Sequence, residues 1–187
     1  AMAPRAAGGG EAAGAGLDEV RTAELTPLPD TPALRRWGSG AARITHLSLR
    51  DVSGASGTNG GDEPFANGGR LRLEFRFCAE RDLAGDGLGA AFSLRNTNGL
   101  DVITFATHEA GTTLPPLRAG QSLQVAFEFD QILPRGDYAL VLAVEQVHGD
   151  DRRYHDFVEH ARLVRTSCAF RTFSVVAPRV VHTVRSP

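Results

Sequence analysis

Strict alternation of apolar and polar residues is the feature of this sequence that most limits its fold. In the segment RLRLEFRF, residues 70–77, every second residue is apolar and the residues between are charged. The segments SLQVAFEFD (122–130) and DYALVLAVEQV (137–147) also place a large apolar residue at every second position, with polar or small residues at most positions between. Successive side chains of a β-strand point to opposite faces of a sheet, so each segment predicts a strand with one buried and one solvated face.

Turn-forming residues separate these segments. Clusters of Gly, Pro, Asn and Asp interrupt the alternation, and further strands are expected over 43–52, 88–95, 101–107 and 169–177. Roughly seven or eight strands with such turns are typical of a two-sheet antiparallel β-sandwich, immunoglobulin-like or jelly-roll. The sequence therefore predicts an all-β fold.

One segment departs from the alternation. In DDRRYHDFVEHARLV, apolar and aromatic residues recur at helical spacing after an Asp that could cap a helix; they are Tyr154, Phe157, Val158, Ala161 and Val164. We therefore expect one short helix near 151–164 within the β domain.

The chain divides into a domain and two flanking segments. With 187 residues, 42% of them hydrophobic, it is long enough for one domain with a core. Its first residues are mostly Gly and Ala, which bury too little to offset the entropy of ordering them. We expect a flexible linker or tag over 1–34, the β-sandwich over 35–178, and a tail over 179–187.

Charge and residue usage exclude several functions. All 20 basic residues are Arg and nearly balance 22 acidic residues, for a net charge of −2, so attraction to nucleic acid or an anionic membrane is not expected. The sequence has no Lys, which excludes a P-loop, a Schiff base and a Ser–Lys dyad. Cys78 and Cys168 are interpreted as reduced thiols of a cytosolic protein. No apolar run reaches the ~20 residues that span a bilayer, and the first residues do not resemble a signal peptide.

Neither a metal site nor a catalytic set can be assigned, and no cofactor is expected. His155 and His160 are too far apart in sequence to share a helix face as metal ligands. No Ser lies in a G-x-S-x-G elbow. Glu74, Glu128 and Glu145 could be paired for glycoside hydrolysis, but carboxylates beside Arg on a wet sheet face would stay ionised, whereas a general acid needs a raised pKa.

Several segments, taken in order, resemble a known family: RRWGSGAARITHLSLRD, LRLEFRF, GAAFSLRNTNGLDVITFATH, LPPLRAGQSLQVAFEF and LPRGDYALVLAV. Across roughly residues 35–177 the chain resembles the C-terminal domain of Wzt-type ATPase subunits of O-antigen polysaccharide ABC transporters. The most specific pieces are the Arg-Trp-Gly-Ser-Gly start, the strand-turn-strand after Ala90 and the Leu-Pro-x-Gly-x-Tyr turn.

The resemblance implies a carbohydrate-binding module that recognises the completed O-antigen polysaccharide of lipopolysaccharide for export. It places the protein at the cytoplasmic face of the bacterial inner membrane, with the transporter's ATPase and membrane subunits as partners. It also implies a homodimer that exchanges a C-terminal strand. The ATPase domain that precedes such modules is not in this sequence, so no enzyme activity is expected. Two departures from the family pattern are a longer 148–169 segment and His108, where a small polar amide is more common.

Sugar sites combine planar hydrogen-bonding side chains with an apolar or aromatic surface for the ring. The polar faces of the predicted strands supply such side chains beside small residues, which would form a shallow trough for an extended polymer. The candidate carbohydrate-binding residues are Arg72, Glu74, Arg76, Ser93, Arg95, Asn96, Gln124, Glu128 and Glu145. Alternatively, Arg and Glu on a sheet face form cross-strand pairs that only keep the face wet, and the Asn residues of RNTNG only shape a turn.

Two functions stay open at this point. One is carbohydrate recognition; the other is a structural or dimerisation module, for which the apolar segment RTFSVVAPRVV would serve as an exchanged edge strand. A glycan-active enzyme is disfavoured because no nucleophile or acid/base pair can be assigned. Trp37 could be a stacking platform for a ligand ring, but it is expected instead to close one end of the sandwich, with Gly38 and Gly40 letting the chain bend there.

Overall fold

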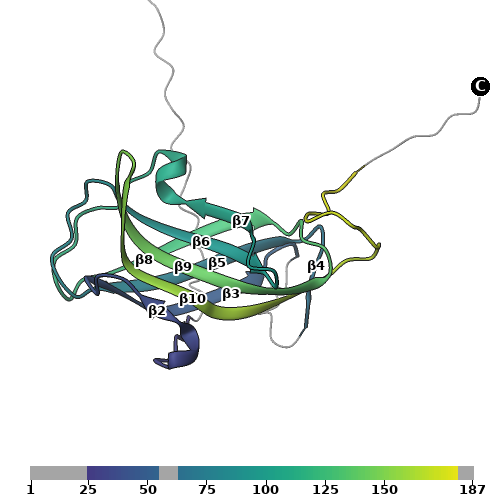
Figure 1. The fold of residues 1–187 in the computed structure, drawn as a ribbon, viewed down its shortest axis with the longest axis horizontal. Helices are drawn as coiled ribbons and strands as arrows, with labels where there is room; N and C mark the ends of the chain where they lie inside the picture. The colour runs from purple at the N-terminus through teal and green to yellow at the C-terminus, as the bar shows by residue number, and fades with distance from the viewer. Residues whose placement is uncertain (1–24, 55–62, 181–187) are drawn as a thin grey trace, which may run out of the picture.

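The computed structural model describes residues 25–54 and 63–180 of the chain (Figure 1). Sheet A has the strand order β1-β3-β5-β8, formed by Thr26–Pro27, Ala42–Asp51, Arg70–Ala79 and Ser122–Asp130. Sheet B has the order β2-β10-β9-β6-β7, formed by Arg36–Trp37, Asp151–Ser167, Gly136–His148, Leu88–Asn96 and Asp101–Ala106. The short β4 (Phe65–Ala66) runs parallel to β10, and the other described pairs are antiparallel. The predicted two-sheet β-sandwich is confirmed.

The apolar stripes of the alternating strands meet between the sheets. On β5 and β6 these stripes are almost completely buried and consist of Leu71, Leu73, Phe75, Phe77, Leu88, Ala90, Phe92 and Leu94. Phe92 of sheet B packs against Phe127 and Phe129 of sheet A, with ring centroids 5.1 and 4.9 Å apart. Burying a side chain of this size contributes about 1.5–3 kcal/mol. The core therefore fixes which face of each strand is left for solvent.

The helix predicted near 151–164 is wrong, because Asp151–Ser167 form β10, which pairs antiparallel with β9. Two register shifts interrupt this pairing. One extra residue in a strand moves the following side chains to the other face of the sheet, and the first shift is of this kind. The second shift leaves residues 159–161 outside the regular pairing, so the buried Val158, Ala161 and Val164 fall three apart and imitate a helical period.

The sandwich includes part of the segment that the sequence assigns to the linker. Thr26–Pro27 pair with β3, and Leu34 of the 3₁₀ turn η1 (Pro32–Leu34) is buried in the core. Residues 1–24 and 181–187, expected to be linker and tail, lie outside the described residues, as do residues 55–62.

The strand expected over 169–177 is not formed in the structure. The chain leaves sheet B after β10, and most of this segment is exposed. It returns at Ala177, which is buried and donates its backbone N–H to the carbonyl oxygen of Ile132 at 2.6 Å. Among the described residues, no helix has the length and apolar character needed to cross a membrane.

Candidate functional site

The structure divides the candidate residues between two opposite outer faces of the sandwich. Arg72, Glu74 and Arg76 of β5, and Gln124 and Glu128 of β8, alternate with core-facing residues and so lie on the outer face of sheet A. The expectation that Glu74 is solvated there is wrong, because this side chain is 3% exposed between Arg50 and Arg72. The remaining candidates belong to sheet B: Ser93, Arg95 and Asn96 are on β6, and Glu145 is on β9. The nine candidates therefore do not form one site.

On sheet A the charged side chains pair with one another. Arg72 donates to Glu128 at 2.7 Å and to Glu74 at 3.1 Å, and Arg50 of β3 donates to the second oxygen of Glu74 at 3.2 Å. The hydrogen bond from Arg72 lowers the pKa of the Glu128 carboxyl. The Gln124 side chain is also hydrogen-bonded within the face, since its Oε1 accepts a bond of 3.3 Å from the guanidinium of Arg76, its cross-strand neighbour. The outer face of sheet A therefore fits the alternative interpretation, in which its Arg and Glu residues form cross-strand pairs with each other.

Sheet B carries a trough on its outer face. The strand register aligns Ala106, Ala91, Ala143, Phe157 and Trp37 in one row across β7, β6, β9, β10 and β2. Three small side chains are thus followed by two large aromatic ones, so the surface is low over β6 and β9 and rises at β10. The resulting hollow has a volume of about 210 Å³. It has the size and form of a shallow site for one ring of a ligand.

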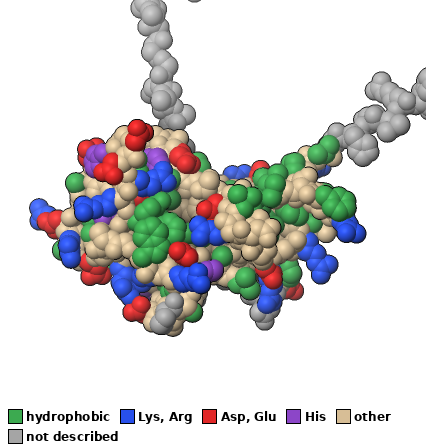
Figure 2. Space-filling model, in the orientation of Figure 1, with side chains coloured by type: hydrophobic (Ala, Val, Ile, Leu, Met, Phe, Trp, Pro, Cys, Tyr) green, Lys and Arg blue, Asp and Glu red, His purple; other side chains and the backbone are tan. Residues whose placement is uncertain are grey.

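Tyr154 and Phe157 line one side of this trough, and Trp37 packs against both; the three rings are called the aromatic wall. The Trp37 and Phe157 rings stack 4.5 Å apart at 25°, and Tyr154 meets both edge-on at 5.1 and 4.9 Å. The Trp37 residue is 48% exposed and its indole N–H donates to Glu159 at 3.2 Å. The expectation that Trp37 closes one end of the sandwich is therefore wrong. Figure 2 shows one face of the molecule, on which hydrophobic side chains (green) are grouped and are bordered by basic (blue) and acidic (red) side chains.

The Gly-Ser-Gly bend after Trp37 fixes that side chain against β10. Gly38 has a φ of 139°, and a Cβ there would lie 2.8 Å from the carbonyl oxygen of His155, so a larger residue would clash with the backbone. The N–H groups of Ser39 and Gly40 donate to the carbonyl oxygens of Tyr154 and His155, both at 3.0 Å. The bend expected from the glycines is present, and it presents the indole on the sheet surface.

Arg95 and Asp101 form one polar edge of the trough. Arg95 donates through Nε to Oδ1 at 2.8 Å and through Nη2 to Oδ2 at 3.1 Å, which is the bidentate geometry of strong ion pairs. The Ser93 hydroxyl donates to Oδ1 at 2.8 Å. The hydrogen bond from Arg95 lowers the pKa of the Asp101 carboxyl. Asp101 is a trough residue that the sequence analysis missed.

Glu145 forms the opposite edge and is almost fully buried, with a side chain 1% exposed. Its Oε1 lies 3.3 Å from His108 Nδ1 and its Oε2 lies 3.6 Å from Arg152 Nε. Neither oxygen has a hydrogen-bond partner among the described residues. Burial raises the pKa of the Glu145 carboxyl, while Arg152 and His108 oppose the rise. The expectation that this carboxylate lies on a wet face is wrong, because the 3₁₀ turn η2 (Thr107–Ala110) brings His108 over it.

Asn96 lies beyond the trough and serves the turn between β6 and β7. Its Oδ1 accepts the backbone N–H groups of Asn98 and Leu100, both at 3.0 Å. The side-chain carbonyl is thus used within the chain, as the turn interpretation expects.

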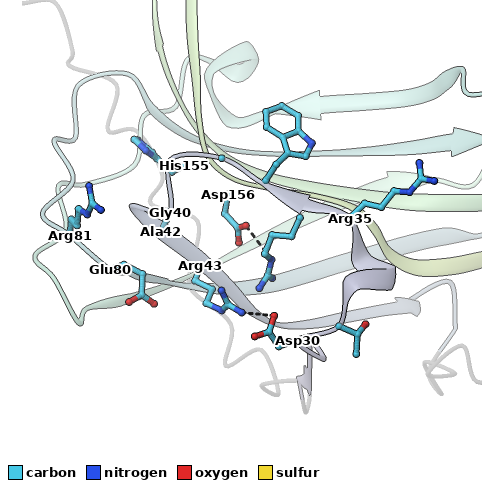
Figure 3. A pocket seen from close by; sticks show the side chains of 13 residues that line it. Asp30, Arg35, Gly40, Ala42, Arg43, Glu80, Arg81, His155 and Asp156 are labelled. Carbon is cyan, nitrogen blue, oxygen red and sulfur yellow. Dashed lines mark ion pairs between the residues drawn. The ribbon is translucent and has the colours of Figure 1, made fainter.

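A larger hollow of about 960 Å³ lies on the other side of Trp37, where β2 approaches β3 (Figure 3). Ion pairs join its walls: Arg36 lies 3.2 Å from Asp156, and Arg43 lies 2.7 Å from Asp30. Asp156 also accepts the Ile44 N–H at 2.6 Å and so links β10 to β3 of the other sheet. These ion pairs hold the walls of the hollow together and the hydrogen bond joins the two sheets beside the aromatic wall, so we assign the residues of this hollow a structural role.

The fold and the trough define a two-sheet β-sandwich module with one open, polar and aromatic face. The chain belongs to the Wzt C-terminal domain family, which matches residues 34–177. It is similar to a solved structure of the C-terminal domain of wzt, with a TM-score of 0.70 and 16% identity over 80% of this chain and 87% of that chain. At this identity the likeness shows the fold alone. The resemblance inferred from the sequence is confirmed, and no curated protein matches the chain.

Proposed function

We propose that this domain is a non-catalytic carbohydrate-binding module that recognises a completed O-antigen polysaccharide for export. The observation that carries the proposal is the trough of sheet B, where small residues lie between an aromatic wall and two Arg–carboxylate pairs. Sugar rings place C–H faces on aromatic side chains and hydroxyls against planar polar groups. Ser93, Arg95 and Glu145 are the sequence candidates that belong to this trough. Asp101, Arg152, Tyr154 and Phe157 also line it.

Membership in the Wzt C-terminal domain family supports the proposal that the module works as part of a polysaccharide ABC transporter. The module would act at the cytoplasmic face of the bacterial inner membrane, with the ATPase and membrane subunits of the ABC transporter as partners. The five candidates on sheet A, Arg72, Glu74, Arg76, Gln124 and Glu128, form a second possible face. We favour sheet B because the polar groups on sheet A already pair with each other.

The test is a calorimetric titration of the domain with the O-polysaccharide of its own source strain, with the polysaccharide of another serotype as control. We expect weak, specific binding, because sugar hydroxyls exchange water for protein at little net gain. Amide shifts in an NMR titration should then map to Ala91 and Ala143 on the trough floor. A well-folded domain that binds neither polysaccharide would contradict the proposal.

A structural or dimerisation role is the second candidate, and the segment after β10 favours it. Its apolar side chains are exposed: Phe170 is 54%, Phe173 92% and Val175 54% exposed. Isolated apolar residues are common on surfaces, but several within one short segment indicate a contact with another chain. Exchange of this segment between the protomers of a homodimer would cover them, and it is compatible with carbohydrate binding.

Truncation before Ser174 should convert such a dimer to a monomer, because it removes part of the exposed apolar segment and the Ala177 contact. Light scattering on the purified domain measures the change. Val175→Ser in the full chain is the matched variant, since it changes one exposed apolar side chain that the truncation deletes, keeps the backbone and should weaken the dimer less. An unchanged dimer after truncation would rule out the exchange.

A further inference from the structure

The charged groups of the sheet B trough occur as two compensated pairs. One is the bidentate Arg95–Asp101 pair on β6 and β7, with bonds of 2.8 and 3.1 Å. The other is Arg152–Glu145 on β10 and β9, with 3.6 Å between Nε and Oε2. Each arginine that lines the trough thus lies against a carboxylate.

Two further side chains beside Glu145 act on its carboxyl with opposite signs. His108 Nδ1 lies 3.3 Å from Oε1, and Glu109 acts on the same carboxyl as a further negative charge. Tyr154 and Glu145 both favour the charged guanidinium of Arg152 and raise its pKa. Because Glu145 is buried, its influence on Arg152 is weakly screened by solvent.

The buried oxygens of Glu145 offset the charge of Arg152 without reaching a ligand, whereas the partly exposed Arg95–Asp101 pair presents a donor and an acceptor side by side. A sugar hydroxyl both donates and accepts a hydrogen bond, so it can use both members of such a pair. A carboxylate or phosphate substituent only accepts, and each arginine that it could approach lies beside the negative charge of Asp101 or Glu145. The Arg95–Asp101 pair therefore matches a hydroxyl group, and both pairs disfavour an anion.

We propose that this trough selects a neutral, hydroxyl-bearing sugar ring over the corresponding acidic sugar, because Asp101 and Glu145 compensate its two arginines. The inference rests on the proposed carbohydrate function and adds the substrate class. Removing either compensating charge leaves an arginine free to bind a carboxylate bidentately, which is the geometry that guanidinium prefers.

The experiment compares matched glycosides that differ only at C6. The probes are the methyl α-glycosides of glucose, galactose and mannose and of their uronic acids, each titrated at pH 7 while the amide shifts of Ala91 and Ala143 are followed by NMR. For wild-type protein we expect a neutral glycoside to bind about tenfold more tightly than its acidic partner, since hydrogen bonds to charged groups contribute differences of this order.

Asp101→Asn and Glu145→Gln should each reduce this preference about tenfold or reverse it. Both substitutions keep the side-chain shape, and Glu145→Gln removes a carboxyl whose pKa is raised by burial, so both variants should fold. Asp30→Asn is the matched control, because Asp30 pairs with Arg43 at 2.7 Å outside the trough and should leave the preference unchanged.

Acidic glycosides that bind wild-type protein as tightly as their neutral partners would overturn the inference and leave the carbohydrate function standing. An unchanged preference in both Asp101→Asn and Glu145→Gln would also overturn it. If neither the glycosides nor the source polysaccharide shift the trough amides, the site does not bind sugar, and the proposed function fails with the inference.

Discussion

Replacing Asp156 with Ala is expected to destabilise the domain by about 3–5 kcal/mol, the range for breaking a buried ion pair by removing one partner. The Asp156 side chain is 4% exposed and lies 3.2 Å from the Nε of Arg36, whose side chain is 16% exposed. The same carboxylate accepts the Ile44 N–H at 2.6 Å. Its loss would leave a buried guanidinium and a buried N–H without this partner, at the junction of the two sheets.

Urea unfolding of the Ala and Asn variants beside wild-type protein measures this effect. Asp156→Asn keeps the shape and an acceptor for Ile44, so it should cost less than Asp156→Ala. A loss below about 1 kcal/mol for the Ala variant at pH 7, the typical value for an exposed pair, would contradict the assigned role.

The pH dependence gives a second check on Asp156. Burial raises the pKa of its carboxyl, and the Ile44 N–H and Arg36 oppose that rise. The native state therefore takes up a proton at a higher pH than the unfolded chain does. This contribution to stability is fully present below the unfolded pKa and is lost as the pH rises through the folded pKa. Wild-type protein should gain stability relative to Asp156→Asn as the pH falls from 7 toward 4.

The fold could be predicted from the sequence wherever the alternation is unbroken. The segments 70–77, 122–130 and 137–147 are strands in the structure because each apolar stripe is buried by the opposite sheet. The helix predicted near 151–164 is wrong because two register shifts against β9 interrupt the alternation of this strand. A bulge depends on how two strands pair, and that pairing is not visible in one segment alone.

The site could be predicted only in part, for the same kind of reason. The alternation of side chains along each strand places Ser93, Arg95 and Glu145 on the faces that point away from the core. The structure brings these three residues into the trough. This alternation does not show which sheet a strand joins. The candidates on β5 and β8 therefore cannot be separated by sequence from those on β6 and β9, although the two groups lie on opposite faces of the sandwich.

The aromatic wall was missed because it depends on long-range register. Trp37 meets Phe157 through the pairing of β2 with β10, two segments separated by most of the domain. The local signals were Trp37, which could be a stacking platform or a plug, and the pair Tyr154 and Phe157, whose spacing also fits a helix. In a bulged strand the same spacing places both rings on the outer surface.

Replacing Trp37 with Ala is expected to weaken binding of the source polysaccharide by about thirtyfold, since aromatic hot spots at binding sites commonly contribute about 2 kcal/mol. The indole is the most exposed part of the wall, and Phe157 holds it in place through stacking at 4.5 Å. Trp37→Phe keeps an aromatic surface but loses the bond to Glu159, so it should weaken binding less. Calorimetric titration measures both variants, with unfolding curves to show that each is folded. Wild-type affinity in a folded Trp37→Ala variant would mean that the wall is not the sugar platform, and the trough would then have to bind through its charged pairs alone.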